Sequence, residues 1–371
     1  MFRPLRIAVL GAGGFVGSRL MELASVFPDW TFVPILRSAK SVARLSKLGI
    51  KPIFANTAEV SALASSLSGF DAVVNLASGD WTSISSDARI VYEASAKAGV
   101  RLLIHLSSAA VFGRVLSSSI HDDSSPQLNH WMLYARAKGA AEKFLRSRLE
   151  NPPMKVVVLR PGLIWGPRSN WSAMPAKDLS AGSAWLGGNG EGICNLCHVD
   201  NLARYIHQIL RSPDPQSGFF NVADPGALTW KSYYDAIANG LGYPASRIHL
   251  TTRGPRFLSP GALLDHLKQE PTFYRFMKKL LSQLSSESKS FLKYHLPALA
   301  GGQYQPPVPV DVTQKGARVP RLTKELWSLH NTRHRLPTAK FTKYYGDPGL
   351  MPFQEALEVT LIWLRFAGFK A

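Results

Sequence analysis

The chain has 371 residues, 46% of them hydrophobic, which is enough to bury the core of one large domain or two modest ones. No apolar run reaches the roughly 20 residues that a membrane-spanning helix requires, and the first residues enter an apolar strand without the pattern of a signal peptide. We therefore expect a cytoplasmic globular protein that has no membrane-spanning segment.

The formal charge of +18 is uneven, because residues 243–371 contain 19 Lys and Arg against 8 Asp and Glu. Such a surplus can attract nucleic acid, an acidic membrane surface or a phosphorylated small molecule, or it can simply be a solvated surface. The aromatic and basic motifs of nucleic-acid-binding modules do not accompany it. We therefore expect no nucleic-acid partner, and a phosphorylated substrate is the functional interpretation of the charge.

The first 149 residues alternate between apolar runs that suit strands and stretches of helical length. The strand-like runs are IAVL, WTFVPIL, KPIFA, DAVVNLAS and LLIHLSS, and MKVVVLRPGLIW continues the series as a sixth strand. Such apolar runs are typical of parallel strands that helices cover on both faces. The pattern predicts an α/β fold in which residues 1–167 form a doubly wound parallel sheet of the Rossmann type.

Beyond residue 167 the pattern loosens into Gly-, Pro- and Ser-rich stretches, and we expect a smaller α/β substrate lobe over residues 168–371, from which some segments can return to the first domain. Its elements include FFNVA, the helical run WKSYYDAIANGLG and a last helix at residues 352–366. Residues 247–337 form a basic insertion that is hard to assign. Within it, residues 273–284 have an apolar and a basic helical face, which fits a helix that packs on the protein or lies on a membrane.

The two cysteines lie in one run, Cys194-Asn-Leu-Cys197-His198, which has the spacing of a haem-attachment motif and of half a zinc site. Haem attachment implies export, and a structural zinc site needs four ligands, which no second Cys/His pair supplies. We therefore predict no metal site, and we place the run in a buried strand that leads into a helix beginning near Asp200.

Three glycines, Gly11, Gly14 and Gly17, follow the first predicted strand. Glycine at a strand-to-helix turn lets the backbone approach a pyrophosphate, and the start of the helix offers unpaired N–H donors and the positive end of its dipole. Glycine-rich turns also serve packing alone. Because this turn follows the first strand of the sheet, it predicts a dinucleotide-binding site.

The end of the second predicted strand indicates which nicotinamide dinucleotide is bound. An acidic side chain there accepts hydrogen bonds from a free 2′-hydroxyl, whereas a cation pairs with a 2′-phosphate. The strand ends at Arg37, and Lys40 and Arg44 follow. NADP is therefore favoured over NAD; the alternative is that Arg37 stacks on the adenine and tolerates either cofactor.

Tyr134 and Lys138 are spaced to lie one turn apart on the same face of a helix, downstream of Ser107 and Ser108 at the end of a strand. A nearby ammonium lowers the pKa of a phenol from its usual value near 10, so that the phenol can exchange a proton with a substrate hydroxyl. Ser108 is placed to hold the substrate oxygen. A single Tyr-x-x-x-Lys is usually structural, so the prediction of a catalytic site depends on the ordered combination.

Four motifs together resemble those of the extended short-chain dehydrogenase/reductases, a family that includes nucleotide-sugar epimerases, dehydratases and reductases. They are residues 11–17, residues 107–113, residues 134–138 and the run LRPGLIWGP at residues 159–167. The resemblance continues through residues 198–203, 220–222 and 340–363, and it leaves residues 247–337 unmatched.

The resemblance implies a role for each matching position. Tyr134 would be the acid/base, Lys138 its partner and the anchor of the nicotinamide ribose, and Ser108 the holder of the substrate oxygen. Around the cofactor, the implied residues are Gly11, Gly14, Phe15, Val16 and Gly17 at the pyrophosphate, Ala77 and Ser78 beneath the nicotinamide ribose, Pro161 beside the nicotinamide ring, and Asn56 near the adenine, where the family often has Asp.

Ala109 and Ala110 follow Ser108 where family dehydratases carry an acidic residue, so dehydration is disfavoured. The resemblance and the basic surplus favour an NAD(P)-dependent reductase, dehydrogenase or 4-epimerase that acts at a secondary alcohol or ketone of a nucleotide-activated sugar. The alternatives are a hydroxysteroid-type or other apolar-alcohol dehydrogenase, and an NAD(P)-binding regulator without turnover. Family members often pair through helices, which implies a homodimer.

Overall fold

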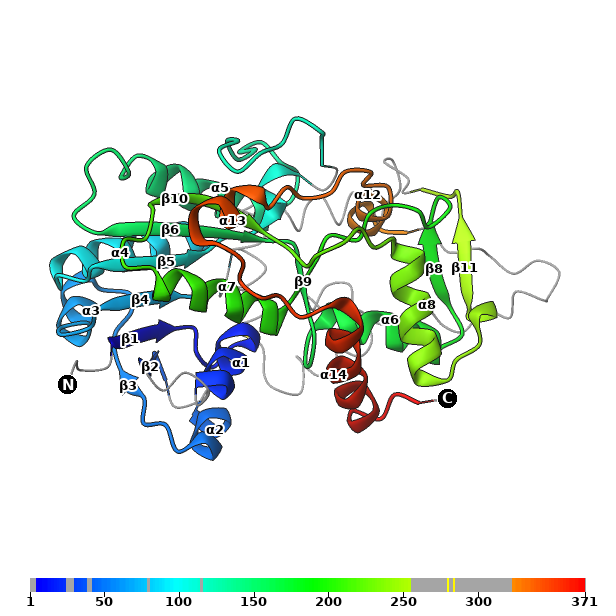
Figure 1. Ribbon diagram of the computed structural model, residues 1–371, viewed down its shortest axis with the longest axis horizontal. Coiled ribbons are helices and arrows are strands. Elements are labelled where there is room, and N and C mark those ends of the chain that lie inside the picture. The colour runs from blue at the N-terminus through cyan, green and yellow to red at the C-terminus, as the bar shows by residue number, and fades with distance from the viewer. Residues whose placement is uncertain are drawn as a thin grey trace.

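The computed structural model describes residues 5–24, 30–38, 42–78, 81–113, 116–254, 279, 283 and 322–370. Lys40, the side chain of Arg44 and nearly all of the amphipathic segment 273–284 lie outside the described residues. Figure 1 shows a large sheet with its helices at one end of the molecule and a smaller lobe at the other.

Seven parallel strands form the large sheet, in the order β10-β6-β5-β4-β1-β2-β3. This order, which runs outward in both directions from β1 and β4, confirms the predicted doubly wound sheet of the Rossmann type. The strands are β1 (Leu5–Leu10), β2 (Trp30–Leu36), β3 (Ile53–Phe54), β4 (Ala72–Asn75), β5 (Leu102–Leu106), β6 (Lys155–Pro161) and β10 (Gly218–Val222).

Helices cover both faces of the large sheet, because successive strand residues point to opposite sides. On one face, Ile7 and Val9 of β1 belong to a core with α1 (Phe15–Leu23), α7 (Val199–Arg211) and α13 (Ala339–Tyr345). On the other face, Ala8 and Leu10 pack with α3 (Val60–Ser66), α4 (Ile84–Lys97) and α5 (Leu133–Arg146). A four-residue helix, α2 (Val42–Leu45), follows β2.

Two expectations about strands are wrong. The run MKVVVLRPGLIW is predicted as one strand, but β6 ends at Pro161 and, after Gly162, β7 (Leu163–Trp165) pairs with β9 (Leu196–His198) in a separate sheet. A Cβ on Gly162 would lie 2.3 Å from the carbonyl oxygen of Asn195, so the break depends on glycine. The prediction places FFNVA in the smaller lobe, whereas it belongs to β10 at the edge of the large sheet. A short apolar run does not reveal which sheet it joins.

The smaller lobe packs around Trp165, Trp230 and Tyr233. Its parallel pair, β8 (Ala184–Gly187) and β11 (Ile248–Thr251), lies beside α8 (Trp230–Leu241) in Figure 1. In the described part of the chain, the lobe also contains the α-helices α6 (Asn170–Ser180), α12 (Lys324–His330) and α14 (Phe353–Phe366). Within the described part of the chain, every helix is too short or too polar to cross a bilayer.

Candidate functional site

A cleft of about 670 Å³ lies at the carboxyl ends of β1, β2, β4 and β5, where the order of the strands reverses. Open parallel sheets bind their ligands at such a switch point. The cleft brings together nearly all of the residues that the sequence singles out: Gly11, Gly14, Phe15, Val16, Gly17, Arg37, Ala77, Ser78, Ser108, Tyr134, Lys138 and Pro161.

The glycine turn at the base of the cleft is closely packed. Gly11 has a φ of +78°, and a Cβ there would lie 2.7 Å from the backbone nitrogen of Ala77. A Cβ on Gly17 would lie 2.2 Å from the carbonyl oxygen of Gly11. Gly14 is the N-cap of α1 and supplies no capping side chain. The first residues of α1, Phe15, Val16 and Gly17, line the cleft, where the sequence predicts that their N–H groups bind a pyrophosphate.

Asn75 and His105, at the ends of β4 and β5, hold the wall beneath the predicted nicotinamide ribose. The side-chain oxygen of Asn75 accepts a hydrogen bond of 3.2 Å from the backbone N–H of Ala77, and its amide nitrogen lies 3.1 Å from Nδ1 of His105. Burial, reinforced by the charge of Lys138, lowers the pKa of His105 to about 3 and keeps the ring neutral. The sequence analysis missed both residues, although a polar residue within each buried strand was a signal.

Tyr134 and Lys138 lie one turn apart on α5, as predicted. Lys138 is 1% exposed, and its ammonium donates a 2.7 Å hydrogen bond to the carbonyl oxygen of Leu106 and lies 6.0 Å from the centre of the Tyr134 ring. Burial lowers the pKa of Lys138 to about 8, against the opposing charge of Glu142. This ammonium is therefore charged at neutral pH and can lose its proton in mildly alkaline solution.

Ser108 is the N-cap of the short 3₁₀ helix Ala109–Phe112, and its hydroxyl oxygen accepts a 3.2 Å hydrogen bond from the backbone N–H of Ala110. A hydroxyl has one proton and can accept two hydrogen bonds. In the hydrogen bond with Ala110, Ser108 acts only as an acceptor. Its hydroxyl proton can therefore be donated to a substrate oxygen in the cleft.

A buried ion pair that the sequence analysis missed lies next to the predicted catalytic residues. Glu142 and Arg160 are both fully buried; Arg160 Nε lies 2.9 Å and Nη2 2.5 Å from the two carboxylate oxygens. The Ser107 hydroxyl donates a 2.5 Å hydrogen bond to the same carboxylate. Glu142 thus fixes the end of β5, next to Ser108, against the helix that carries Tyr134 and Lys138.

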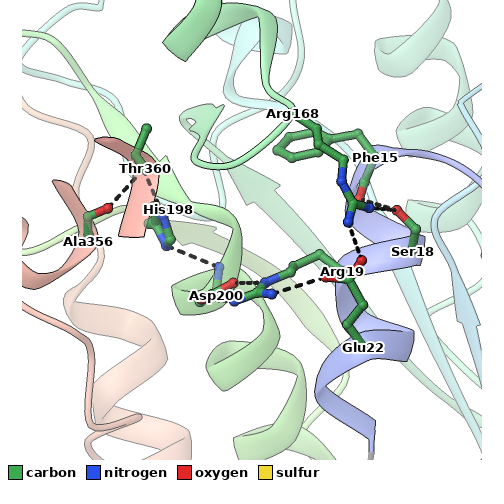
Figure 2. Close-up of polar contacts among 9 residues, drawn as sticks. All are labelled: Phe15, Ser18, Arg19, Glu22, Arg168, His198, Asp200, Ala356 and Thr360. Carbon is green, nitrogen blue, oxygen red and sulfur yellow. Dashed lines mark hydrogen bonds and ion pairs between the residues drawn. The ribbon is translucent and has the colours of Figure 1, made fainter. Parts of the chain in front are cut away.

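Ionic contacts connect α1 to α7 and to the loop after β7 (Figure 2). Arg19 makes two hydrogen bonds to the carboxylate of Asp200, of 2.6 and 2.8 Å, and a third of 3.0 Å to Glu22. Arg168, after β7, pairs with Glu22 and donates a 3.3 Å hydrogen bond to Ser18. Its φ of +72° is unusual for a residue other than glycine. These contacts fix the helix that begins at the glycine turn.

The run that contains both cysteines has a structural role in this fold. Nδ1 of His198 accepts a 3.3 Å hydrogen bond from the N–H of Asp200 as the N-cap of α7, and Nε2 lies 3.4 Å from the Thr360 hydroxyl, as Figure 2 shows. Cys194 and Cys197 are free and buried, and burial raises the pKa of both thiols well above the usual value. The thiols are therefore protonated, which does not favour nucleophilic or metal chemistry.

Asn56 is the predicted site residue that does not line the cleft. Its amide caps its own turn, accepting a 3.1 Å hydrogen bond from the N–H of Ala58 and donating one of 3.4 Å to Glu59. The neighbouring Thr57 lines the cleft instead. The sequence therefore predicts a loop that does line the cleft. It does not indicate which of two neighbouring side chains in the turn points into the cleft.

Comparisons with known proteins agree with this architecture. The chain superposes on the solved structure of a dTDP-glucose 4,6-dehydratase from Streptomyces venezuelae, with NAD bound, with a TM-score of 0.66 and 17% sequence identity. The match covers 99% of each of the two chains. An N-acetyl-α-D-glucosaminyl-diphospho-ditrans,octacis-undecaprenol 4-epimerase of Escherichia coli O157:H7 is 25% identical over 66% of this chain and 75% of its own length.

A sterol-4-α-carboxylate 3-dehydrogenase of Dictyostelium discoideum is 22% identical over 68% of this chain and 81% of its own length. The family model that describes the NAD-dependent epimerase/dehydratase family matches residues 7–223, which is more than half of the chain and includes the glycine turn, Ser108, Tyr134 and Lys138. The chain therefore belongs to the NAD-dependent epimerase/dehydratase family.

Proposed function

We propose that this enzyme transfers hydride between a nicotinamide dinucleotide and a secondary alcohol or ketone, with Tyr134 as the acid/base. The observation that carries the proposal is that Ser108, Tyr134 and Lys138 line the same cleft as the glycine turn. The dinucleotide, when bound on that turn, supplies or accepts the hydride. In the reducing direction, the Tyr134 hydroxyl gives its proton to the substrate oxygen, which Ser108 holds, and the Lys138 ammonium stabilises the phenolate that remains.

We propose a nucleotide-activated sugar as the substrate. The epimerase of Escherichia coli and the dehydratase of Streptomyces venezuelae act on sugars that carry a diphosphate, as their names state. The basic surplus of residues 243–371 would attract such a substrate. Ala109 and Ala110 follow Ser108, and neither offers a carboxylate for the proton transfers of dehydration. Reduction, oxidation or 4-epimerisation is therefore favoured over loss of water.

An apolar alcohol is the second candidate substrate, because the sterol dehydrogenase of Dictyostelium discoideum matches over a similar share of the chain. Mass spectrometry of the small molecules released from the purified, denatured protein tests both candidates and identifies any retained dinucleotide. Strong product inhibition by free UDP or dTDP would support the sugar, whereas co-sedimentation with anionic vesicles would support the apolar alcohol. An unchanged cofactor redox state with inverted substrate stereochemistry would identify an epimerase.

A regulator without turnover is disfavoured, because all three catalytic residue types are present.

Arg37→Ala should weaken NADP binding by roughly tenfold to a hundredfold, the loss expected when a charged hydrogen bond is removed, and should change NAD binding by less than about threefold. Arg37 is exposed and lines the cleft at the end of β2, where a 2′-phosphate would lie. Isothermal titration with each dinucleotide measures both affinities. Equal losses for the two cofactors would instead indicate that Arg37 stacks on the adenine.

The rate of reduction should fall as pH rises through the pKa of Lys138, because the deprotonated amine no longer stabilises the Tyr134 phenolate. Burial places that pKa at about 8, so kcat/KM for reduction should decline above about pH 8. The Lys138→Arg variant keeps a positive charge over the whole pH range and should abolish this decline, whatever its activity relative to the wild type. A wild-type profile that stays flat to about pH 10 would contradict the role of Lys138.

The resemblance to a family whose members pair through helices also supports a homodimer. Light scattering after size-exclusion chromatography tests it.

A further inference from the structure

A small recess of about 50 Å³ adjoins the cleft at the catalytic serine. The two hollows share Ser108, Pro161, Gly162 and Leu163 as lining residues. A substrate whose oxygen is held by Ser108 therefore has a group close to the reacting carbon at the opening of this recess.

The far walls of the recess are mostly apolar. They include Ala109, Ala110, Leu116, Ile193, Trp230 and Leu329, which come from the loop after β5, the segment before β9, α8 and α12. Among the described lining residues none is acidic or basic. These described walls therefore offer an alkyl group more contact than they offer a sugar hydroxyl.

The polar side chains of the far walls are engaged with the protein itself. The Asn195 amide donates a 3.1 Å hydrogen bond to the carbonyl oxygen of His334 and accepts one of 2.7 Å from the N–H of Leu336. The Thr332 hydroxyl donates to the Ser328 carbonyl oxygen at 3.1 Å, and the indole N–H of Trp230 donates to the Leu329 carbonyl oxygen at 3.0 Å. These hydrogen bonds hold the walls in place and engage both polar atoms of the Asn195 amide, the Thr332 hydroxyl proton and the Trp230 indole N–H.

We infer that the recess selects substrates with a small alkyl group on the carbon next to the reacting alcohol or ketone, and that it disfavours a hydroxyl-bearing group there. The inference rests on the proposed hydride transfer at Ser108 and Tyr134. A hydroxyl in the recess would give up its hydrogen bonds to water without finding equivalent partners on these walls, whereas an alkyl group gains from leaving water. A deoxygenated sugar or an alicyclic alcohol fits this requirement, and a fully hydroxylated hexose does not.

Two matched pairs of probes test the selection by initial rates. One pair is 2-methylcyclohexanone and 2-hydroxycyclohexanone with reduced cofactor; the other is the 6-deoxy form of UDP-glucose and UDP-glucose itself with oxidised cofactor. The alkyl member of each pair should have a kcat/KM higher by roughly tenfold to a hundredfold, the range over which apolar pockets discriminate. A preference for the hydroxylated members would overturn the inference.

Ala109→Leu should fill the recess and reduce the preference for the alkyl members to about threefold or less, because the alkyl group no longer fits. Ile193→Ala should enlarge it and shift the preference toward 2-ethylcyclohexanone. Ala367→Leu is the matched control, since it makes the same substitution at an exposed position after α14 and should leave the ratio unchanged. If neither Ala109→Leu nor Ile193→Ala changes the ratio of kcat/KM between the alkyl and hydroxylated probes, the assignment of this recess is refuted.

Crystals pressurised with xenon give a test that does not depend on activity, because apolar cavities bind xenon and remain free of ordered water. Xenon should occupy the recess of the wild-type protein and be absent from Ala109→Leu. Ordered waters bonded to Asn195 or Thr332 in place of xenon would overturn the inference. If no probe is turned over while xenon binds, the proposed function fails and the apolar character of the recess stands.

Discussion

Tyr134→Phe should lower kcat for hydride transfer by a factor of about 10² to 10⁴, the range that a positioned acid/base contributes, while dinucleotide affinity changes by less than about threefold. Phenylalanine keeps the ring that lies 6.0 Å from the Lys138 ammonium, so the cleft retains its shape and only the proton donor is lost. Stopped-flow measurement of cofactor absorbance gives the rate, and titration calorimetry gives the affinity.

Tyr344→Phe provides the matched control for Tyr134→Phe. Tyr344 is 47% exposed on α13 and does not line the cleft, so the variant should be as active as the wild type. Near-normal turnover by Tyr134→Phe would remove the acid/base assignment and with it the proposed mechanism.

Glu142→Ala should lower the free energy of unfolding by about 3–5 kcal/mol, the usual result of removing one partner of a buried ion pair. The large effect is expected because Arg160 is fully buried and would be left with an uncompensated charge. Urea denaturation measures it. The variant should also lose activity under conditions in which it is still folded, because Ser107 and the neighbouring Ser108 lose their support.

Two further variants distinguish the buried charge from a general packing effect. Asp123→Ala removes a carboxylate that is 63% exposed and pairs with Lys340, and it should cost less than about 1 kcal/mol. The double variant Glu142→Leu/Arg160→Met replaces both charges by apolar groups and should recover much of the lost stability. A loss below about 1 kcal/mol for Glu142→Ala would show that Arg160 finds other partners.

The sequence predicts the parts of this fold that local periodicity determines. Near-continuous apolar strands indicated the parallel sheet, glycine spacing indicated the turn at Gly11, and helical spacing placed Tyr134 and Lys138 on one face. These features depend on residues within a few positions of one another. The structure brings the predicted residues into one cleft, apart from Asn56, and their chemical roles stay predictions.

The features that the sequence did not predict depend on residues far apart in the chain. Glu142 contacts Ser107, which is 35 positions away in the sequence, and Arg160, which is 18 positions away. A single Arg in an apolar strand does not indicate which acidic residue it pairs with. Likewise, β10 joins β6 after the chain has passed through α6, β8 and α7. The recess beside Ser108 is formed by five segments between Ser108 and Thr332. No local pattern encodes such assemblies.

The return of β10, α7 and α13 to the large sheet means that the cofactor half of the molecule is assembled from several separate stretches of the chain. A fragment that ended at residue 167 would leave β6 as an open edge and uncover the apolar surface that α7 and α13 bury. Swapping substrate halves between homologues at a single junction should therefore yield insoluble chimaeras, and productive grafts need to exchange loops such as the one that follows Ser108 within an intact framework.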